Sequence, residues 1–318
     1  MSTTPRKFAR LRQRKAFSGR QRVLRETREW TAFLTLAAAA VSSVFITVLI
    51  VVVLLNESGS FFRAPEVSSQ FWRFFVDTTW APTSDPPRIG ILPLVSATIM
   101  TTLIALLVAL PIGTVVALYL SEFAPFALRE TIKPSLELLS AVPTVVYGYF
   151  ALTFVSPILR WLIPGLPQAN MLSAGIVMGI MIIPYVSSLS EDAMRAVPML
   201  LREGSYALGA NRLMTAWKVV VPSALSGIGA AFILGISRAI GETMIVAVAA
   251  GMQPRFTFNP TAQAQTITAY IVSMSQGETP HGTMGYQSIF AAGLVLFVMT
   301  LTFNVLGFWL RRRYHQAY

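Results

Sequence analysis

Long apolar runs alternate with short polar segments along the whole chain. A helix needs about 20 mainly apolar residues to cross a bilayer. Six segments reach that length: 32–55, 91–120, 134–159, 171–189, 223–250 and 288–310. Each is bounded by charge or by Pro/Gly punctuation, such as APTSDPPRIG before the second segment. The pattern therefore predicts an all-α, polytopic membrane protein with six transmembrane helices.

The composition supports a lipid environment. Of the 318 residues, 54% are hydrophobic and only 12% are charged, whereas soluble domains carry about 25% charged residues. Membrane lipid is therefore an expected partner. Cysteine is absent, which excludes disulfides, thiolate metal sites and cysteine nucleophiles. His281 and His315 are the two histidines and lie far apart in sequence, so we expect no metal site.

The net charge of +11 is concentrated beside the apolar segments. Residues 1–30 hold ten Lys/Arg, and RRR at 311–313 follows the last segment. This placement favours membrane topology over nucleic-acid binding. With the N-terminus inside, alternate connections hold nineteen Lys/Arg inside and five outside, so both termini are predicted to be cytoplasmic. The first segment is too long for a signal peptide and is read as an uncleaved anchor.

This topology divides the chain into a basic cytoplasmic segment, 1–30, and a six-span permease domain, 31–318. Its long external loops are 56–90 and 252–287. For most of their residues we expect solvated connectors, with a docking surface for an external partner as the alternative. The aromatic stretch SSQFWRFFVDTTW in the first loop suits a short helix at the membrane interface. In the fourth span, Gly175 and Gly179 form a GxxxG pattern that indicates close helix packing.

The cytoplasmic connection 191–222 is too polar to span, yet apolar residues recur in it. Around Gly209 their spacing predicts two short amphipathic helices that meet at a flexible corner. Such a pair can pack on its own bundle, lie on lipid, or enter a groove of a partner. Physical reasoning by itself favours packing on the bundle.

The stretch EGSYALGANRLMTAWKVVVP within this connection resembles the EAA loop of ABC importer permeases. Glu203, Ala207, Gly209 and Pro222 match its marked positions, although GS replaces the two alanines after the glutamate. The resemblance implies the type I (MetI-like) permease fold. It also implies that the loop is a coupling helix seated in a cleft of an ATPase subunit. Its contact residues would then be Glu203 and Gly209.

The turn residues Ala207, Leu208 and Ala210 complete that coupling segment in the resemblance. Two further stretches, AVPTVVYGYFAL (141–152) and SRAIGETMIVAVAAG (237–251), resemble permeases of the phosphate-specific ABC importer, nearest to the PstC type. This implies translocation of inorganic phosphate by ATP-driven alternating access in a bacterial cytoplasmic membrane. The implied partners are a PstA-type sister permease, two PstB-type ATPase subunits and an external PstS-type phosphate-binding protein.

No P-loop motif GxxxxGK[ST] occurs in the chain. If ATP drives transport, ATP and Mg²⁺ therefore bind to a partner, and this chain has no cofactor of its own. No base–nucleophile set is apparent either, so we predict no catalytic residues. Other readings remain: an importer of another oxyanion or of an organic solute, or an ion-coupled transporter or anion channel that works alone.

Arg238 and Glu242 are the two ionisable residues of the fifth apolar segment. On a helix they would share one face, and an arginine at a membrane centre costs about 2.5–3.5 kcal/mol if it faces lipid. Three accounts follow: a structural ion pair, a contact to another subunit, or a translocation path. In the third, Arg238 binds a passing oxyanion and Glu242 holds the guanidinium when substrate is absent. The family resemblance favours the third account.

Overall fold

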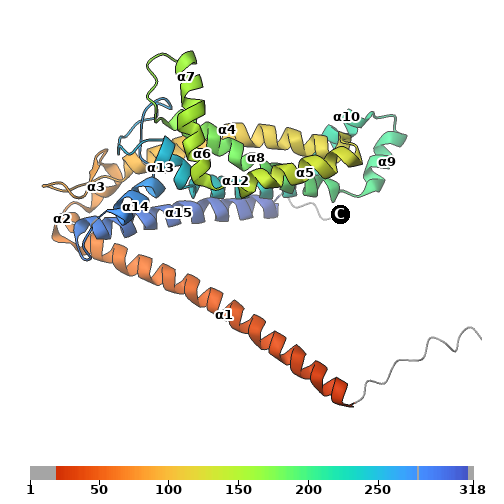
Figure 1. Cartoon of the computed structure of the whole chain (residues 1–318), viewed down its shortest axis with the longest axis horizontal. Coiled ribbons are helices and arrows are strands. Elements are labelled where there is room, and N and C mark those ends of the chain that lie inside the picture. Colours follow the sequence, from red (N-terminus) through yellow and green to blue (C-terminus); the bar gives the residue numbers. More distant parts are fainter. Residues whose placement is uncertain (1–18, 278, 314–318) are drawn as a thin grey trace, which may run out of the picture. The chain divides into compact units, whose positions relative to one another are not determined.

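The computed structural model describes residues 19–277 and 279–313, and most of them are helical (Figure 1). The chain forms two compact units, Met1–Val53 and Leu54–Tyr318. Helix α1 (Gly19–Arg63) passes from the first unit into the second. Among the described residues, five helices are long and apolar enough to cross a membrane, or six if one bent pair counts as a single span.

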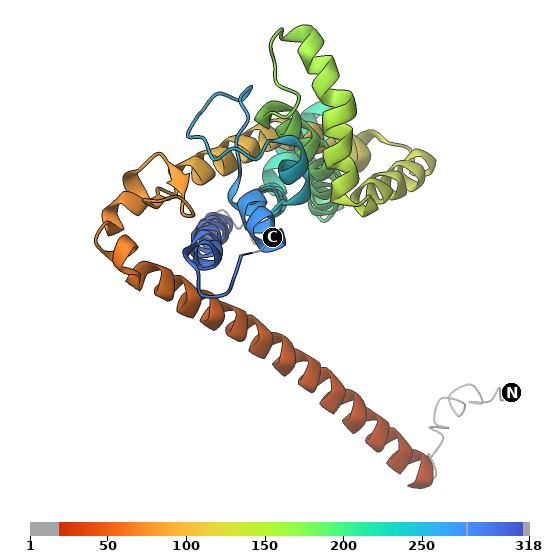
Figure 2. The same cartoon turned by 60° about the vertical axis from the view of Figure 1, so that its left-hand side comes forward.

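Four helices of the second unit pack extensively against one another, and Figures 1 and 2 show the unit from two sides. They are α4 (Leu92–Leu118), α8 (Met171–Arg195), α12 (Leu225–Ile240) and α15 (Met284–Arg313). The shorter helices are α2 (Pro65–Ser68), α3 (Phe71–Val76), α5 (Phe126–Ala141), α6 (Thr144–Phe150), α7 (Ser156–Leu162), α9 (Met199–Ala207), α10 (Arg212–Thr215), α11 (Val221–Ser223), α13 (Met244–Ala249) and α14 (Ile267–Gln276). Three π-helical turns continue α4, α6 and α10: η2 (Tyr119–Phe123), η3 (Ala151–Val155) and η4 (Ala216–Val220).

Helices α4 and α8 pack against each other more extensively than any other pair in the described part of the chain. Two glycines of α8 allow this approach. A Cβ added at Gly175 would lie 2.7 Å from the Cβ of Ile104, and one at Gly179 would lie 2.8 Å from the carbonyl oxygen of Ala105. Such distances leave no room for a side chain, so the close packing predicted from the GxxxG pattern is confirmed.

The second and fourth predicted spans agree with α4 and α8, whereas the third begins later than predicted. Residues 126–141 form the separate helix α5, which has no buried side chain. The span itself begins at Thr144. Val142 takes extended dihedrals (φ −64°, ψ 130°), because a following proline, here Pro143, disfavours the helical region for the residue before it.

The fifth predicted span, 223–250, is not one continuous helix. It bends by 70° between α11 and α12 and breaks again between Ile240 and Met244. The 16 residues of α12 extend about 24 Å, less than the hydrocarbon thickness of about 30 Å. This span therefore consists of shorter helical pieces, an arrangement that transporters use where backbone lines a cavity.

The outer loops are more ordered than solvated connectors. The first contains α3, as predicted, and a short antiparallel hairpin of β1 (Trp80–Ala81) and β2 (Arg88–Ile89), a minor departure from an all-α fold. The second contains α14, and residues 264–270 are buried. The hydroxyl of Tyr270 lies 2.6 Å from that of Ser288 on α15. The expectation of a solvated connector is therefore wrong for this part of the second loop.

Candidate translocation and coupling sites

Arg238 lies in the last turn of α12, half-buried against α8. Its guanidinium carbon is 4.5 Å from the ring centre of Tyr185, a cation–π distance. Its Nη2 lies 3.9 Å from the sulfur of Met181, and its Nε is buried without a hydrogen-bond partner. Within the described residues, the salt bridges include none to Arg238. The guanidinium is thus held by an aromatic face, and no carboxylate among the described residues pairs with its donors.

The close approach of α12 to α8 explains why Arg238 reaches Tyr185. Gly235 lies about one turn before Arg238, and a Cβ added there would be 3.2 Å from a methyl carbon of Val186. The missing side chain lets the two helices come together beside the tyrosine. Backbone proximity therefore places a charged side chain on an aromatic ring.

Glu242 does not share a helix face with Arg238, contrary to the prediction. Helix α12 ends at Ile240 with Gly241 as its C-cap, so the chain turns before the glutamate is reached. Glu242 is buried, and its Oε1 accepts hydrogen bonds from the backbone N–H groups of Met244 and Ile245, at 3.1 and 3.4 Å. These amides belong to the first turn of α13 and need acceptors. The carboxylate therefore serves them instead of pairing with Arg238.

The predicted coupling segment forms two helices joined at a glycine corner, as the sequence indicated. Helix α9 ends at Ala207, and Gly209 takes the left-handed φ of +82° that glycine adopts without strain. Helix α10 begins at Arg212. The hydroxyls of Ser205 and Thr215, 2.9 Å apart, connect the two helices.

Several apolar side chains of this segment are exposed. Leu208 is 90% exposed and Leu200 is 78% exposed. Glu203, Ala207 and Gly209 are also exposed, and Ala210 is half-buried. The expected packing on the bundle holds for one side of the pair, where Leu201 and Ala216 contact an apolar cluster that includes Leu118 of α4. The loop presents an apolar surface that this chain leaves uncovered.

Two ion-pair clusters, each with a buried glutamate, lie at the ends of α4 and α8, and the sequence analysis missed both. Arg202 of α9 donates through Nη2 to Oε1 of Glu122 at 3.0 Å. Lys133 of α5 bonds to the fully buried Glu191 at 2.7 Å and to Asp192 at 2.8 Å. The partners are 80 and 58 residues apart in sequence. Glu191 and Asp192 directly follow an apolar span, and this position could have indicated one of the two clusters.

The pKa of Lys133 is raised above its ordinary value of 10.5. Burial lowers this pKa, but the hydrogen bonds to Asp192 and Glu191, together with their negative charges, raise it by more. The ammonium therefore stays charged and joins α5 to the end of α8.

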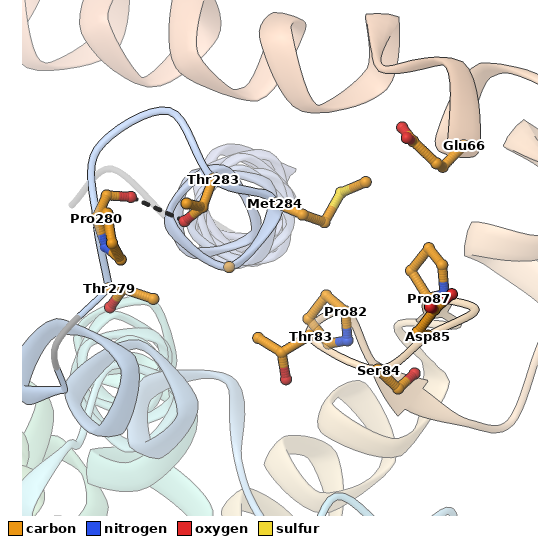
Figure 3. Close-up of a pocket in the computed structure, with 11 residues that line it drawn as sticks. Glu66, Pro82, Thr83, Ser84, Asp85, Pro87, Thr279, Pro280, Thr283 and Met284 are labelled. Carbon is orange, nitrogen blue, oxygen red and sulfur yellow. Dashed lines mark hydrogen bonds between the residues drawn. The ribbon is translucent and has the colours of Figure 1, made fainter.

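The two outer loops line an open cavity of about 490 Å³ (Figure 3). Its walls carry the carboxylates of Glu66 and Asp85 and the hydroxyls of Thr279 and Thr283. Thr283 donates to the carbonyl oxygen of Pro280 at 2.8 Å, which is the dashed line in Figure 3. Separately, the described residues hold no group of three or more side chains of metal-binding type.

Sequence comparison identifies the class of protein. Residues 109–317 match the family described as "Binding-protein-dependent transport system inner membrane component". Because this match covers more than half of the chain, the protein belongs to that family of ABC importer permeases, as the sequence analysis predicted. It is a multi-pass transport component of the inner membrane.

Among individual relatives, the chain is similar to the phosphate transport system permease protein PstC of Xylella fastidiosa. The two are 32% identical over 306 residues, 90% of this chain and 91% of the relative. It is also similar to the probable ABC transporter permease protein YqgH of Bacillus subtilis, at 36% identity over 233 residues, 73% of this chain and 75% of the relative.

Solved structures support the fold. A bacterial ABC transporter involved in the import of the acidic polysaccharide alginate aligns with a TM-score of 0.63 and 15% identity, over 93% of this chain and 100% of that one. The methionine transporter MetNI, in an inward-facing conformation, aligns with a TM-score of 0.52 and 17% identity, over 71% of this chain and 95% of that one. The predicted type I permease fold is confirmed.

Proposed function

We propose that this protein is the PstC-type permease subunit of an ABC importer that carries inorganic phosphate across the bacterial cytoplasmic membrane. The family assignment and the PstC relatives support this function. The observation that carries it is Arg238, a guanidinium held on Tyr185 with no carboxylate partner in the described part of the chain. Charged residues inside membrane spans are costly and rare, and they commonly mark the path of a substrate or an ion.

The chemistry of Arg238 suits phosphate. A guanidinium is charged at every physiological pH and presents a planar fork of donors to two oxygens of one anion. The ring of Tyr185 holds that plane while leaving its donors available. Transport also requires that binding be weak enough to release the ion, and a single half-exposed arginine meets that requirement better than an enclosed cluster.

Glu242 has a revised role in this proposal. Its Oε1 caps the first turn of α13, while its Oε2 has no hydrogen bond to the described residues. We assign to that second oxygen an acceptor role for a protonated phosphate oxygen. Sulfate carries no such proton at neutral pH, so Glu242 would help to discriminate between the two anions.

The coupling segment is proposed to contact the ATPase. Glu203, Ala207, Leu208, Gly209 and Ala210 lie on or beside the corner between α9 and α10. An exposed apolar helix face of this kind fits a hydrophobic groove on a partner. ATP and Mg²⁺ would bind to two PstB-type subunits, so hydrolysis belongs to them. This chain would carry no cofactor.

The remaining partners follow from the same proposal. A PstA-type permease would complete the translocation path, and a PstS-type protein would deliver phosphate from outside. We assign the docking of that protein to the surface around the cavity in Figure 3, which both outer loops form. Both termini would lie in the cytoplasm. Closure of the ATPases would turn the two permeases outward, and ATP hydrolysis would return them inward.

The test is uptake of labelled phosphate by proteoliposomes that contain the complete complex. Arg238→Ala should abolish uptake while the complex still assembles. Arg160→Ala is the matched control, because Arg160 is an exposed arginine at the end of α7, and this variant should import normally. Normal import by Arg238→Ala would refute the assigned role. Uptake of sulfate or another oxyanion in place of phosphate would change the substrate.

A further inference from the structure

Arg202 is the single buried residue of α9, and Leu201 beside it packs against an apolar cluster of the bundle. Its guanidinium makes four hydrogen bonds. Nη2 and Nε donate to the two carboxylate oxygens of Glu122, at 3.0 and 3.4 Å. Nη1 donates to the carbonyl oxygen of Val197 at 2.6 Å, and Nη2 also donates to that of Met194 at 2.9 Å. One side chain therefore joins three pieces of the chain, two through backbone carbonyls and one through a carboxylate.

Each of these pieces belongs to a different part of the fold. Glu122 lies in η2, which continues α4. Met194 is in the last turn of α8, and Val197 lies in the short connection to α9. Without the guanidinium, the tilt of α9 would be restrained by the three-residue connection 196–198, by apolar contacts and by the hydroxyl contact of Ser205 with Thr215. The planar fork of an arginine fixes direction as well as distance.

Stability alone does not account for this ion pair. Glu122 and Arg202 are 6% and 9% exposed, and apolar residues of similar volume often replace such buried pairs at no cost in stability. The surroundings would accept them, because Met194 and Val197 are in an apolar cluster with Ala117 and Leu118 of α4. The pair supplies a directional restraint that apolar packing lacks.

Helix α8 connects the contacts of Arg202 with the proposed anion path at Arg238. Helices α4 and α8 form the most extensive helix contact in the described part of the chain. Helix α8 also carries Tyr185, on which Arg238 rests. Tyr185 and Met194 are nine residues apart on one continuous helix, or about 14 Å. A displacement of α9 that is passed to the end of α8 therefore reaches the residue that holds Arg238.

We propose that Arg202 is a positioning residue that makes α9 and the adjoining ends of α4 and α8 move as one body. The inference rests on the proposed function, in which an ATPase moves α9. Through Glu122 and the carbonyl oxygens of Met194 and Val197, that movement turns the helices around the path. If the link is removed, the ATPase moves α9 alone, and hydrolysis continues without import.

The experiment measures phosphate uptake and ATP hydrolysis in the same proteoliposomes, with the complete complex and phosphate-loaded binding protein. The central variant is Arg202→Met with Glu122→Leu, which leaves no unpaired buried charge. We expect it to assemble and hydrolyse ATP, with the phosphate imported per ATP reduced about tenfold or more, the weight of one lost charged hydrogen bond. A wild-type ratio would overturn the proposal.

Arg202→Lys provides a second measurement if the double variant does not assemble. Lysine keeps the charge opposite Glu122 but cannot reproduce the planar fork, so the ratio should fall while assembly persists. A wild-type ratio in this variant would likewise count against the link. Arg160→Gln is the control, because Arg160 is an exposed arginine at the end of α7, and its ratio should not change.

A measurement of ATP hydrolysis separates the failure of this inference from the failure of the proposed function. If the wild-type complex imports no phosphate, the proposed function fails. The link is then read from ATP hydrolysis, which loaded binding protein should stimulate in wild type through the permease. Loss of that stimulation in Arg202→Lys, with basal hydrolysis retained, would support the link. Full stimulation in Arg202→Lys would refute it.

Discussion

Replacing Gly179 by alanine tests the contact between α4 and α8 on which both sites depend. The added Cβ would lie 2.7 Å from the Cβ of Val108 and 2.8 Å from the carbonyl oxygen of Ala105. Ordinary contacts begin near 3.4 Å, so α4 must retreat by about 0.6 Å, and a backbone carbonyl cannot rotate away as a side chain can. Overpacking of this kind costs about 1–3 kcal/mol.

Gly229 of α12 is the matched control, because a Cβ added there meets nothing within 4 Å. Both substitutions gain about 1 kcal/mol of helix propensity, so the packing cost is the difference between them. The assay heats the detergent-purified protein and follows the monodisperse fraction by size-exclusion chromatography. Gly179→Ala should lose that fraction at a lower temperature than wild type, and Gly229→Ala should not. Equal behaviour of the two variants would refute the packing argument.

Three further substitutions test other parts of the site. Arg238→Lys keeps the charge but loses the stacking on Tyr185 and one of the two hydrogen bonds that a guanidinium can donate to an anion. Half-maximal uptake should therefore need about tenfold more phosphate. An unchanged uptake curve would contradict the assigned geometry. Glu242→Gln keeps an oxygen to cap α13 but changes the second acceptor, so discrimination between phosphate and sulfate uptake should fall, and equal discrimination would remove that hypothesis. Lys133→Met leaves the buried Glu191 with Arg195, at 3.6 Å, as its remaining partner. The variant should lose about 2–3 kcal/mol of stability, measured as a lower temperature of thermal unfolding. Because the pKa of Lys133 is raised in the folded protein, its contribution should be complete below pH 10.5 and be lost as the pH rises through the folded value; a loss already at neutral pH would contradict the ion pair.

The sequence was most informative where apolar runs are long and regular. The start of α8 at Met171 and the position of α4 follow from hydrophobic length alone. The glycine corner at Gly209 follows from its residue type, because few other residues adopt a positive φ. These features depend on neighbours in sequence, so a single sequence suffices to predict them.

Features that depend on distant contacts were not predictable in the same way. Arg202 and Glu122 are far apart in sequence, and nothing local indicates that they meet. Helix α14 has only ten residues and lies in a segment whose Gly, Thr and Gln content indicates a loop. The break after Ile240 did have a local signal, since Gly241 and Glu242 interrupt an apolar run. Because Arg238 and Glu242 are four residues apart, close to one helical turn, the sequence suggested a continuous helix through this break.

The buried part of the second outer loop is fastened to the helix break beside Arg238. The hydroxyl of Thr268 donates to the backbone carbonyl of Glu242 at 2.8 Å, and the N–H of Ile267 donates to the hydroxyl of Thr98 on α4 at 3.0 Å. Any protein that pulls on the exterior of this loop therefore also pulls on the peptide four residues from the guanidinium. Through these two bonds, a displacement of the outer loop would be passed to α4 and to the backbone that follows α12.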